Sequence, residues 1–198
     1  MEESPAAESL PPAPGAEENV ALDFVNSAIA LPGGHFIDLL GTPEDTNRWL
    51  TQHGLAPDDA GVQEMCATQL RSLREHLRSL FAAHVAGLPA LPAALSAVNG
   101  ALSRAPTAAL LYWDEKTGPY RAAPCPTNEI LDRALATLAA NAADLLTGPD
   151  ADRLTGCGSA PCNRYLLRRG RRHWCSTRCG DRARAARAYA RRTQPRAD

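Results

Sequence analysis

The sequence of 198 residues lacks the patterns that mark several large classes of protein. It has no apolar run long enough to span a membrane, and its N-terminus has neither the basic segment nor the apolar stretch of a secretory signal. It also lacks the motifs H-E-x-x-H, G-x-S-x-G and G-x-G-x-x-G, the P-loop, and carboxylate pairs at a spacing typical of catalysis. We therefore expect a cytoplasmic protein that is not an enzyme and does not enter a membrane.

Cysteine is scarce except in one short stretch. Four of the six cysteines form two close pairs, Cys157-x4-Cys162 and Cys175-x3-Cys179. Two such pairs are typical of a tetrahedral structural Zn²⁺ site, in which four thiolates leave no open position for a catalytic water. We predict one structural zinc ion bound by these four residues. Two disulfides or an iron–sulfur cluster are the alternatives, and His173 is a weaker candidate ligand.

The overall charge is close to zero because two opposite charges cancel. Residues 153–198 have 13 arginines, no lysine and 2 aspartates, a net charge of +11, whereas residues 1–152 have 8 basic and 20 acidic residues, a net charge of −12. A small, strongly basic zinc module is typical of nucleic-acid binding, because arginine pairs with phosphate and guanine through two hydrogen bonds. DNA is therefore the expected partner. The alternative is a basic surface that docks on an acidic protein.

The arginines fall in the loop between the cysteine pairs and in a helix that we predict after the second pair. Asp181 is expected to cap this Ala- and Arg-rich helix. Three of its arginines recur at spacings of three and four residues and would form one basic ridge. The predicted DNA-binding residues are Arg168, Arg169, Arg171, Arg172, Arg178, Arg182, Arg184, Arg187 and Arg191.

The preceding part of the chain has the apolar spacing of a helical domain. The predicted fold class is mainly α with one small β-hairpin, a helical N-terminal domain being followed by a small four-cysteine zinc finger that ends in a basic helix. We divide the chain into a disordered acidic and proline-rich tail (1–17), the helical domain (18–150), the finger (151–192) and a second disordered tail (193–198).

Within the helical domain the sequence predicts five helices and one pair of strands. The first helix starts at Glu18 and carries Leu22, Val25 and Ile29 on one face; the others span 42–53, 59–86, a short segment ending before Pro106, and a segment capped by Thr127 and ended by Gly148. Segments 107–113 and 118–121 would form the hairpin. For the long helix we expect Val62, Met65, Cys66, Leu70, Leu73, Leu77, Leu80 and Phe81 to be buried, and Arg71, Arg74, Glu75 and Arg78 to be exposed.

Polar side chains next to the first apolar stripe have two interpretations. They either fix the following loop by hydrogen bonds or form the polar floor of a ligand pocket. The residues of the possible pocket are Asp23, Asn26, Arg48 and Trp49. In the second interpretation the domain senses a small-molecule effector, and it could also mediate assembly as a homodimer.

Two stretches of the chain resemble a known family of bacterial proteins. Trp174-Cys175-Ser176 and Cys179-Gly180-Asp181-Arg182 are similar to the W-C-S-x-x-x-C-G-N-R signature of CGNR zinc-finger proteins, with Asp181 in place of asparagine and a shorter loop between the cysteine pairs. The segment V-A-L-D-F-V-N-S resembles the start of their N-terminal ABATE domain. The resemblance implies that the four cysteines bind zinc and that the protein is a stress-induced transcription regulator.

Overall fold

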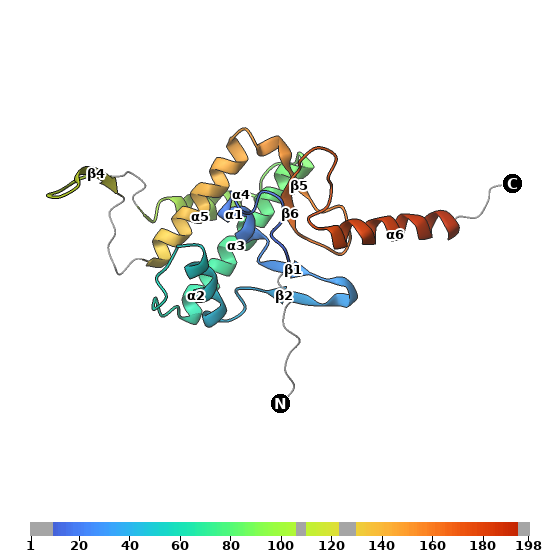
Figure 1. The fold of residues 1–198 in the computed structure, drawn as a ribbon, viewed down its shortest axis with the longest axis horizontal. Helices are drawn as coiled ribbons and strands as arrows, with labels where there is room; N and C mark the ends of the chain where they lie inside the picture. The colour runs from blue at the N-terminus through green and yellow to red at the C-terminus, as the bar shows by residue number, and fades with distance from the viewer. Residues whose placement is uncertain (1–9, 106–109, 123–129, 194–198) are drawn as a thin grey trace, which may run out of the picture.

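The computed structural model describes residues 10–105, 110–122 and 130–193. Its helices are α1 (Val20–Val25), α2 (Pro43–Gln52), α3 (Glu64–Ala86), α4 (Pro92–Leu102), α5 (Ile130–Thr147) and α6 (Thr177–Thr193), with short 3-10 turns η1 (Pro32–Gly34) and η2 (Ala151–Arg153). The strands form antiparallel hairpins, β1 (Ala28–Ala30) with β2 (Phe36–Asp38), β3 (Leu110–Asp114) with β4 (Gly118–Ala122), and β5 (Leu154–Gly156) with β6 (Tyr165–Leu167). The predicted fold class, mainly helical with a small C-terminal finger ending in a helix, is confirmed (Figure 1).

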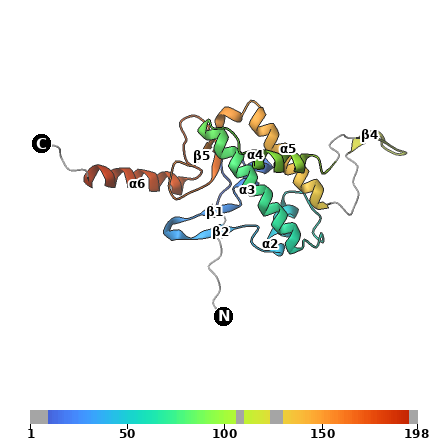
Figure 2. The ribbon, with the colours of Figure 1, turned by 180° about the vertical axis from the view of Figure 1, so that it is seen from behind.

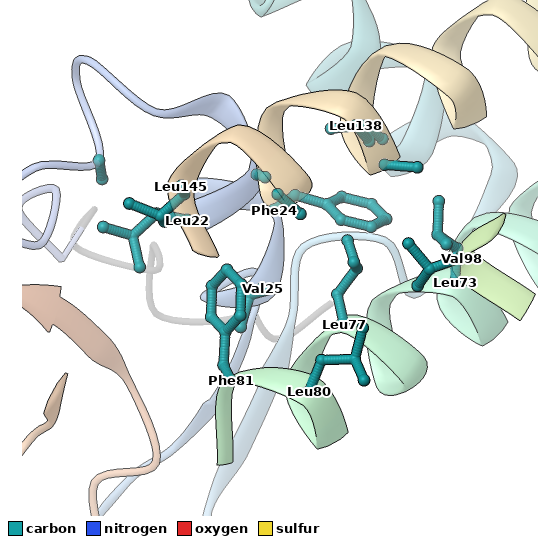
Figure 3. Close-up of a cluster of buried hydrophobic side chains, with 14 of the residues drawn as sticks. Leu22, Phe24, Val25, Leu73, Leu77, Leu80, Phe81, Val98, Leu138 and Leu145 are labelled. Carbon is teal, nitrogen blue, oxygen red and sulfur yellow. The ribbon is translucent and has the colours of Figure 1, made fainter. Parts of the chain in front are cut away.

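The core is built between α1, α3, α4 and α5, which pack against one another. On α3 the leucines at 70, 73, 77 and 80 recur at helical spacing and are buried, because they lie on the face that meets the other helices. Figure 3 shows the Phe24 ring of α1 between Leu138 of α5 and Leu77 of this face. Packing of these helices gives α1 a fixed support, and the segment that follows α1 carries the contacts to the finger.

Helix α2 and the β3–β4 hairpin agree with the sequence-based expectation. Thr42 caps α2 by accepting a hydrogen bond from Asp45 N–H at 3.1 Å, and the helix ends one residue before His53. In the hairpin Tyr112 lies opposite Tyr120, with ring centroids 5.5 Å apart. The predicted strand residues 107–109 and the predicted cap Thr127 lie outside the described residues.

The first helix is shorter than predicted. It ends at Val25, and Ile29 lies in β1, where it pairs with Ile37 of β2 rather than continuing the helical stripe. Asn26 and Ser27 leave the helix because their side chains have distant partners, Tyr165 and Arg74 respectively. Two hairpins beyond the predicted one therefore occur in the described residues, one beside the core and one in the finger.

The supposedly exposed face of α3 is largely covered. Arg74 is only 4% exposed, and its guanidinium binds the Asp38 carboxylate at 2.6 and 2.8 Å and the Ser27 hydroxyl at 3.0 Å. Burial by itself raises the pKa of Asp38, but the hydrogen bonds and charge of Arg74 outweigh it and lower this pKa. The prediction of an exposed Arg74 is therefore wrong, because the long side chain holds the β1–β2 hairpin.

Two further expectations for the long helix need correction. The helix begins at Glu64 rather than at residue 59, and Met65 is 67% exposed instead of buried. Arg71 donates to the Leu40 carbonyl at 2.9 Å, so it joins Arg74 in holding the segment after α1. Apolar spacing identified the buried leucines correctly but could not show that arginines on the adjoining face would meet backbone carbonyls.

Residues 10–17 were predicted to belong to a disordered tail, but the structure places them against the finger. Ala13 is buried, and the Pro14 carbonyl accepts a hydrogen bond from Leu167 N–H at 2.8 Å. Gly15 has φ +90°, and a Cβ atom there would lie 2.7 Å from the Leu167 side chain. Small residues let this segment approach β6 closely. The remainder of the predicted tail lies outside the described residues.

Figures 1 and 2 show two elements that project from opposite ends of the molecule, the β3–β4 hairpin and α6. Helix α6 starts at the finger and extends away from the packed helices. None of the helices in the described segments combines the length and the hydrophobicity needed to cross a membrane. The projecting α6 is the element on which the predicted basic ridge lies.

Candidate metal centre and nucleic-acid interface

The two cysteine pairs are brought together by the β5–β6 hairpin and the start of α6. Cys157 and Cys162 lie in the connection between the strands, where Cys157 N–H donates to the Arg164 carbonyl at 2.8 Å. Cys175 lies just before α6 and Cys179 lies in its first turn, and their sulfur atoms are 3.6 Å apart. Ser176 accepts a hydrogen bond from Cys179 N–H at 3.2 Å, the geometry of an N-cap.

The four sulfur atoms have the spacing of a tetrahedral zinc site. All four Sγ atoms lie within 4.8 Å of one another, and Cys162 Sγ is 3.6 Å from Cys175 Sγ. Zn–S bonds of about 2.3 Å in a tetrahedron place sulfur atoms about 3.8 Å apart, so an ion fits between them with little movement. The cluster can hold one structural zinc ion, as predicted. His173 is exposed and lies outside the cluster.

The close spacing of the thiols shifts their pKa values in opposite directions. Hydrogen bonds with Cys162 and Cys175 lower the pKa of Cys157 to about 2. The same contact with Cys157 raises the pKa of Cys162 to about 11, and contacts with Cys157 and Cys162 raise that of Cys175. Without a cation, one thiolate at this spacing therefore keeps its neighbours protonated. A divalent cation makes four adjacent thiolates compatible.

Two arginines contact the sulfur atoms. Arg182 Nη2 donates to Cys179 Sγ at 3.3 Å and to the Ser159 carbonyl at 3.1 Å, and its Nε donates to the Ala160 carbonyl at 3.1 Å. Arg164 Nη1 lies 4.0 Å from Cys175 Sγ. Zinc with four thiolates has a net charge of −2, which these guanidinium groups compensate. Arg182, predicted to bind DNA, thus joins the two cysteine pairs.

Two arginines of the basic ridge on α6 are held in place by an aromatic ring. The guanidinium groups of Arg184 and Arg187 lie over the Trp174 ring, 5.7 and 5.6 Å from its centroid. Gly180 lies close to the same ring, and a Cβ atom there would be 3.2 Å from it. Cation–π contacts of this kind hold long side chains in place while leaving their charge accessible. Arg191 is exposed in the last turn.

Asp181 is not the cap that the sequence suggested. Helix α6 starts at Thr177, before Asp181, which therefore lies inside the helix, and Ser176 takes the capping position instead. The Asp181 carboxylate forms an ion pair with Arg184 on the exposed surface. The helix starts earlier than predicted because Ser176 caps it between the two cysteines, which places Cys179 in its first turn.

The remaining predicted arginines have different surroundings. Arg169 forms an ion pair with Glu18 at 3.0 Å, and Arg172 Nε donates to the Trp174 carbonyl at 3.0 Å. Arg168, Arg171 and Arg178 are exposed. The structure therefore brings Arg184 and Arg187 together at the Trp174 ring, whereas Arg169 pairs with Glu18 of the helical domain.

The finger is joined to the helical domain by hydrogen bonds that the sequence does not reveal. The buried Asn26 amide donates to the Tyr165 carbonyl at 2.9 Å and accepts from Tyr165 N–H at 2.7 Å. Arg78 donates to the carbonyls of Val25 and Asn163, at 2.7 and 2.8 Å. Asn26 is thus a structural residue that pairs with β6 as a neighbouring strand would.

Three of the four predicted pocket residues line one cavity. Asp23, Asn26 and Trp49 lie in the wall of a cavity of about 310 Å³, whereas Arg48 is exposed and pairs with Asp45 at 2.6 Å. Sequence reasoning missed two charged residues of this wall, His53 and Arg164. No local pattern marks them, because His53 follows α2 and Arg164 comes from the finger.

His53 and Asp23 form an ion pair inside this cavity. His53 Nε2 is 3.1 Å from the Asp23 carboxylate, and its Nδ1 is 2.8 Å from the Trp49 carbonyl. Burial lowers the pKa of His53, but the Asp23 carboxylate and the Trp49 carbonyl outweigh burial and raise it. The charge of Asp23 is therefore balanced locally when the imidazole is protonated.

Comparison with known proteins gives two family matches. Residues 18–149 match the ABATE family, described as "Putative stress-induced transcription regulator", and residues 153–192 match the CGNR zinc finger. No match to the chain was found among curated proteins. Because the first match covers more than half of the chain, and the second covers the segment that holds the four clustered cysteines, the protein belongs to the ABATE family and carries a CGNR zinc finger.

Proposed function

We propose that the protein is a DNA-binding transcription regulator without catalytic activity, in which the finger contacts DNA and the helical domain senses a ligand or mediates assembly. The observation that carries the proposal is the projecting helix α6, with exposed arginines on a face anchored by Trp174 (Figure 1). An α-helix of this kind fits the major groove of DNA, and its arginines can pair with phosphates and with guanine.

The charge distribution supports the same role. The segment from residue 153 has a net charge of +11, and the segment before it has a net charge of −12. Because α6 extends away from the acidic domain, its outer turns are presented to a partner rather than to that domain. Zinc supplies the rigidity, since it holds the start of α6 against the β5–β6 hairpin.

The salt dependence of DNA affinity tests the proposal. If about five arginines contact phosphates, log K should fall against log salt with a slope of about −4.5, at about 0.9 per contact. We expect Arg187→Ala to weaken binding at every salt concentration and to reduce the slope by about one. The measurement is fluorescence anisotropy of a labelled duplex titrated with the zinc-loaded protein at several salt concentrations.

Arg48→Ala is the matched control, because Arg48 is also exposed on a helix but lies in the acidic domain. It should leave both the affinity and the slope unchanged. DNA affinity that does not depend on salt, or equal effects of the two variants, would contradict the proposal. That result would favour the second candidate function, an adaptor whose basic finger docks on an acidic protein.

A further inference from the structure

A cavity lies at the junction of the helical domain and the finger, and residues of both line it. Ile29, Ile37 and Leu39 of the first hairpin region form an apolar side, Trp49 comes from α2, and Arg164 comes from the finger. Its volume of about 310 Å³ is at the lower end of the range of small-molecule sites, about 300–1,000 Å³. The cavity is thus large enough for a small ligand with an apolar body.

Two residues of this wall have buried N–H groups without a hydrogen-bond partner. They are Trp49 Nε1 and Arg164 Nε, in side chains that are 3% and 4% exposed. Across the described ranges only five buried side-chain atoms lack a partner, and two of the five belong to residues lining this cavity. An unpaired buried donor costs about 1–3 kcal/mol. Both groups are closed off from the cavity in this structure, so a ligand reaches them only after a small side-chain shift. Because both groups only donate, the complementary ligand group is an acceptor.

The charged groups around the cavity balance one another, so the choice of acceptor rests on the type of donor. The Asp23 carboxylate is paired with His53, whose pKa is raised, so this pair is close to neutral when His53 is protonated. Arg164 shares the compensation of the thiolates with Arg182, which donates directly to Cys179 Sγ. A guanidinium N–H binds a carboxylate more strongly than it binds a neutral carbonyl.

We propose that this cavity binds a small carboxylic acid with an apolar body, whose carboxylate accepts hydrogen bonds from Arg164 and Trp49. The apolar body lies against Ile29 and Ile37. Because Arg164 also contacts Cys175 at the start of α6, a bound acid joins the helical domain to the element that carries the basic ridge. An effect of the acid on DNA affinity rests on the proposed function, whereas its binding does not.

Octanoate is the probe, and the test uses the zinc-loaded full chain without DNA. We expect octanoate to give saturable heat in calorimetry and to raise the melting temperature. Octanamide, which has the same shape without the charge, should bind about tenfold more weakly, because it lacks the charge-assisted hydrogen bond. Trp49→Phe keeps an aromatic ring but removes the indole N–H, and Arg164→Lys removes the Nε–H donor. Each should weaken octanoate binding by about tenfold.

Arg78→Lys is the control, because Arg78 joins the same two parts of the chain but does not line the cavity. It should bind octanoate as the wild type does. If Arg164→Lys fails to fold, as judged by melting without ligand, Trp49→Phe decides. Absence of octanoate binding, equal binding of octanamide, or unchanged affinity in Trp49→Phe would overturn the proposal. Since DNA is absent, any of these results leaves the DNA-binding proposal standing.

Discussion

At the scale of single residues, buried polar side chains determine how the finger is joined to the rest of the chain. Asn26 satisfies both backbone groups of Tyr165, and Arg74 holds Asp38 and Ser27. Such groups are costly to bury without partners, so each contact requires its distant partner to be in place. Asn26 of the ABATE segment therefore has a structural role, because it joins the helical domain to β6.

We expect Asn26→Ala to lower the free energy of unfolding by about 2–4 kcal/mol, because it leaves the N–H and the carbonyl of Tyr165 buried and unpaired. The measurement is urea unfolding of the zinc-loaded protein. Asn99→Ala is the matched control, since Asn99 is exposed on α4 and its replacement by alanine should not destabilise the protein. Equal losses in the two variants would show that the Asn26 amide does not hold β6.

At the scale of elements, α6 has two parts with different roles. Its first two turns belong to the metal centre through Cys179 and Arg182, and its later turns carry the exposed arginines. Trp174 connects the two, because it packs on Gly180 and supports Arg184 and Arg187. The zinc site thereby fixes the direction in which the basic ridge points.

Asp181→Asn is predicted to tighten DNA binding at low salt, where screening is weakest, because it removes a negative charge beside Arg184. Since Asp181 is not a cap, stability should change by about 0.5 kcal/mol or less, the contribution of an exposed ion pair. Duplex affinity at two salt concentrations and a melting curve provide both quantities.

Asp144→Asn makes the same change in net charge on the exposed surface of α5 and is the control. An equal gain in affinity from this variant would mean that only the total charge matters. No gain from Asp181→Asn would place the start of α6 away from the DNA.

At the scale of the whole molecule, the finger and the helical domain share one hydrophobic core. Leu154, Leu166 and Leu167 of the β5–β6 hairpin belong to the same buried cluster as Phe24 and Phe81. The Tyr165 ring meets Phe81 edge-on, with centroids 5.7 Å apart. A continuous core of this kind favours a single cooperative unfolding transition over two independent ones.

Chelation of the zinc is therefore expected to destabilise the whole protein. Loss of the metal should remove several kcal/mol of stability, which corresponds to a fall in melting temperature of at least about 8 °C. Circular dichroism and tryptophan fluorescence, recorded with and without chelator, should report one shifted transition. Cys179→Ser should melt like the chelated protein. Cys66→Ser is the control, because Cys66 lies outside the metal cluster, and this variant should respond to chelator as the wild type does. An unshifted transition of the helical domain would contradict the shared core.

The amino-acid sequence by itself determined those features that depend on near neighbours. The spacing of four cysteines predicted the metal cluster, and the cap at Thr42 predicted the start of α2. The leucine spacing of α3 predicted its buried face, because side chains at helical intervals share one side of a helix. In each case the residues that cause the feature lie within one short stretch of the chain.

Only the tertiary structure decided which polar residues serve the fold and which are available to a partner. Asn26 and Tyr165 are 139 positions apart, and Arg182 reaches the first cysteine pair across 22 positions, so no local periodicity records either contact. For the same reason Arg74, predicted to be exposed, and Ala13, predicted to lie in a disordered tail, are both buried. A long polar side chain is equally compatible with water and with a buried carbonyl or carboxylate, and the packing of distant segments selects between them.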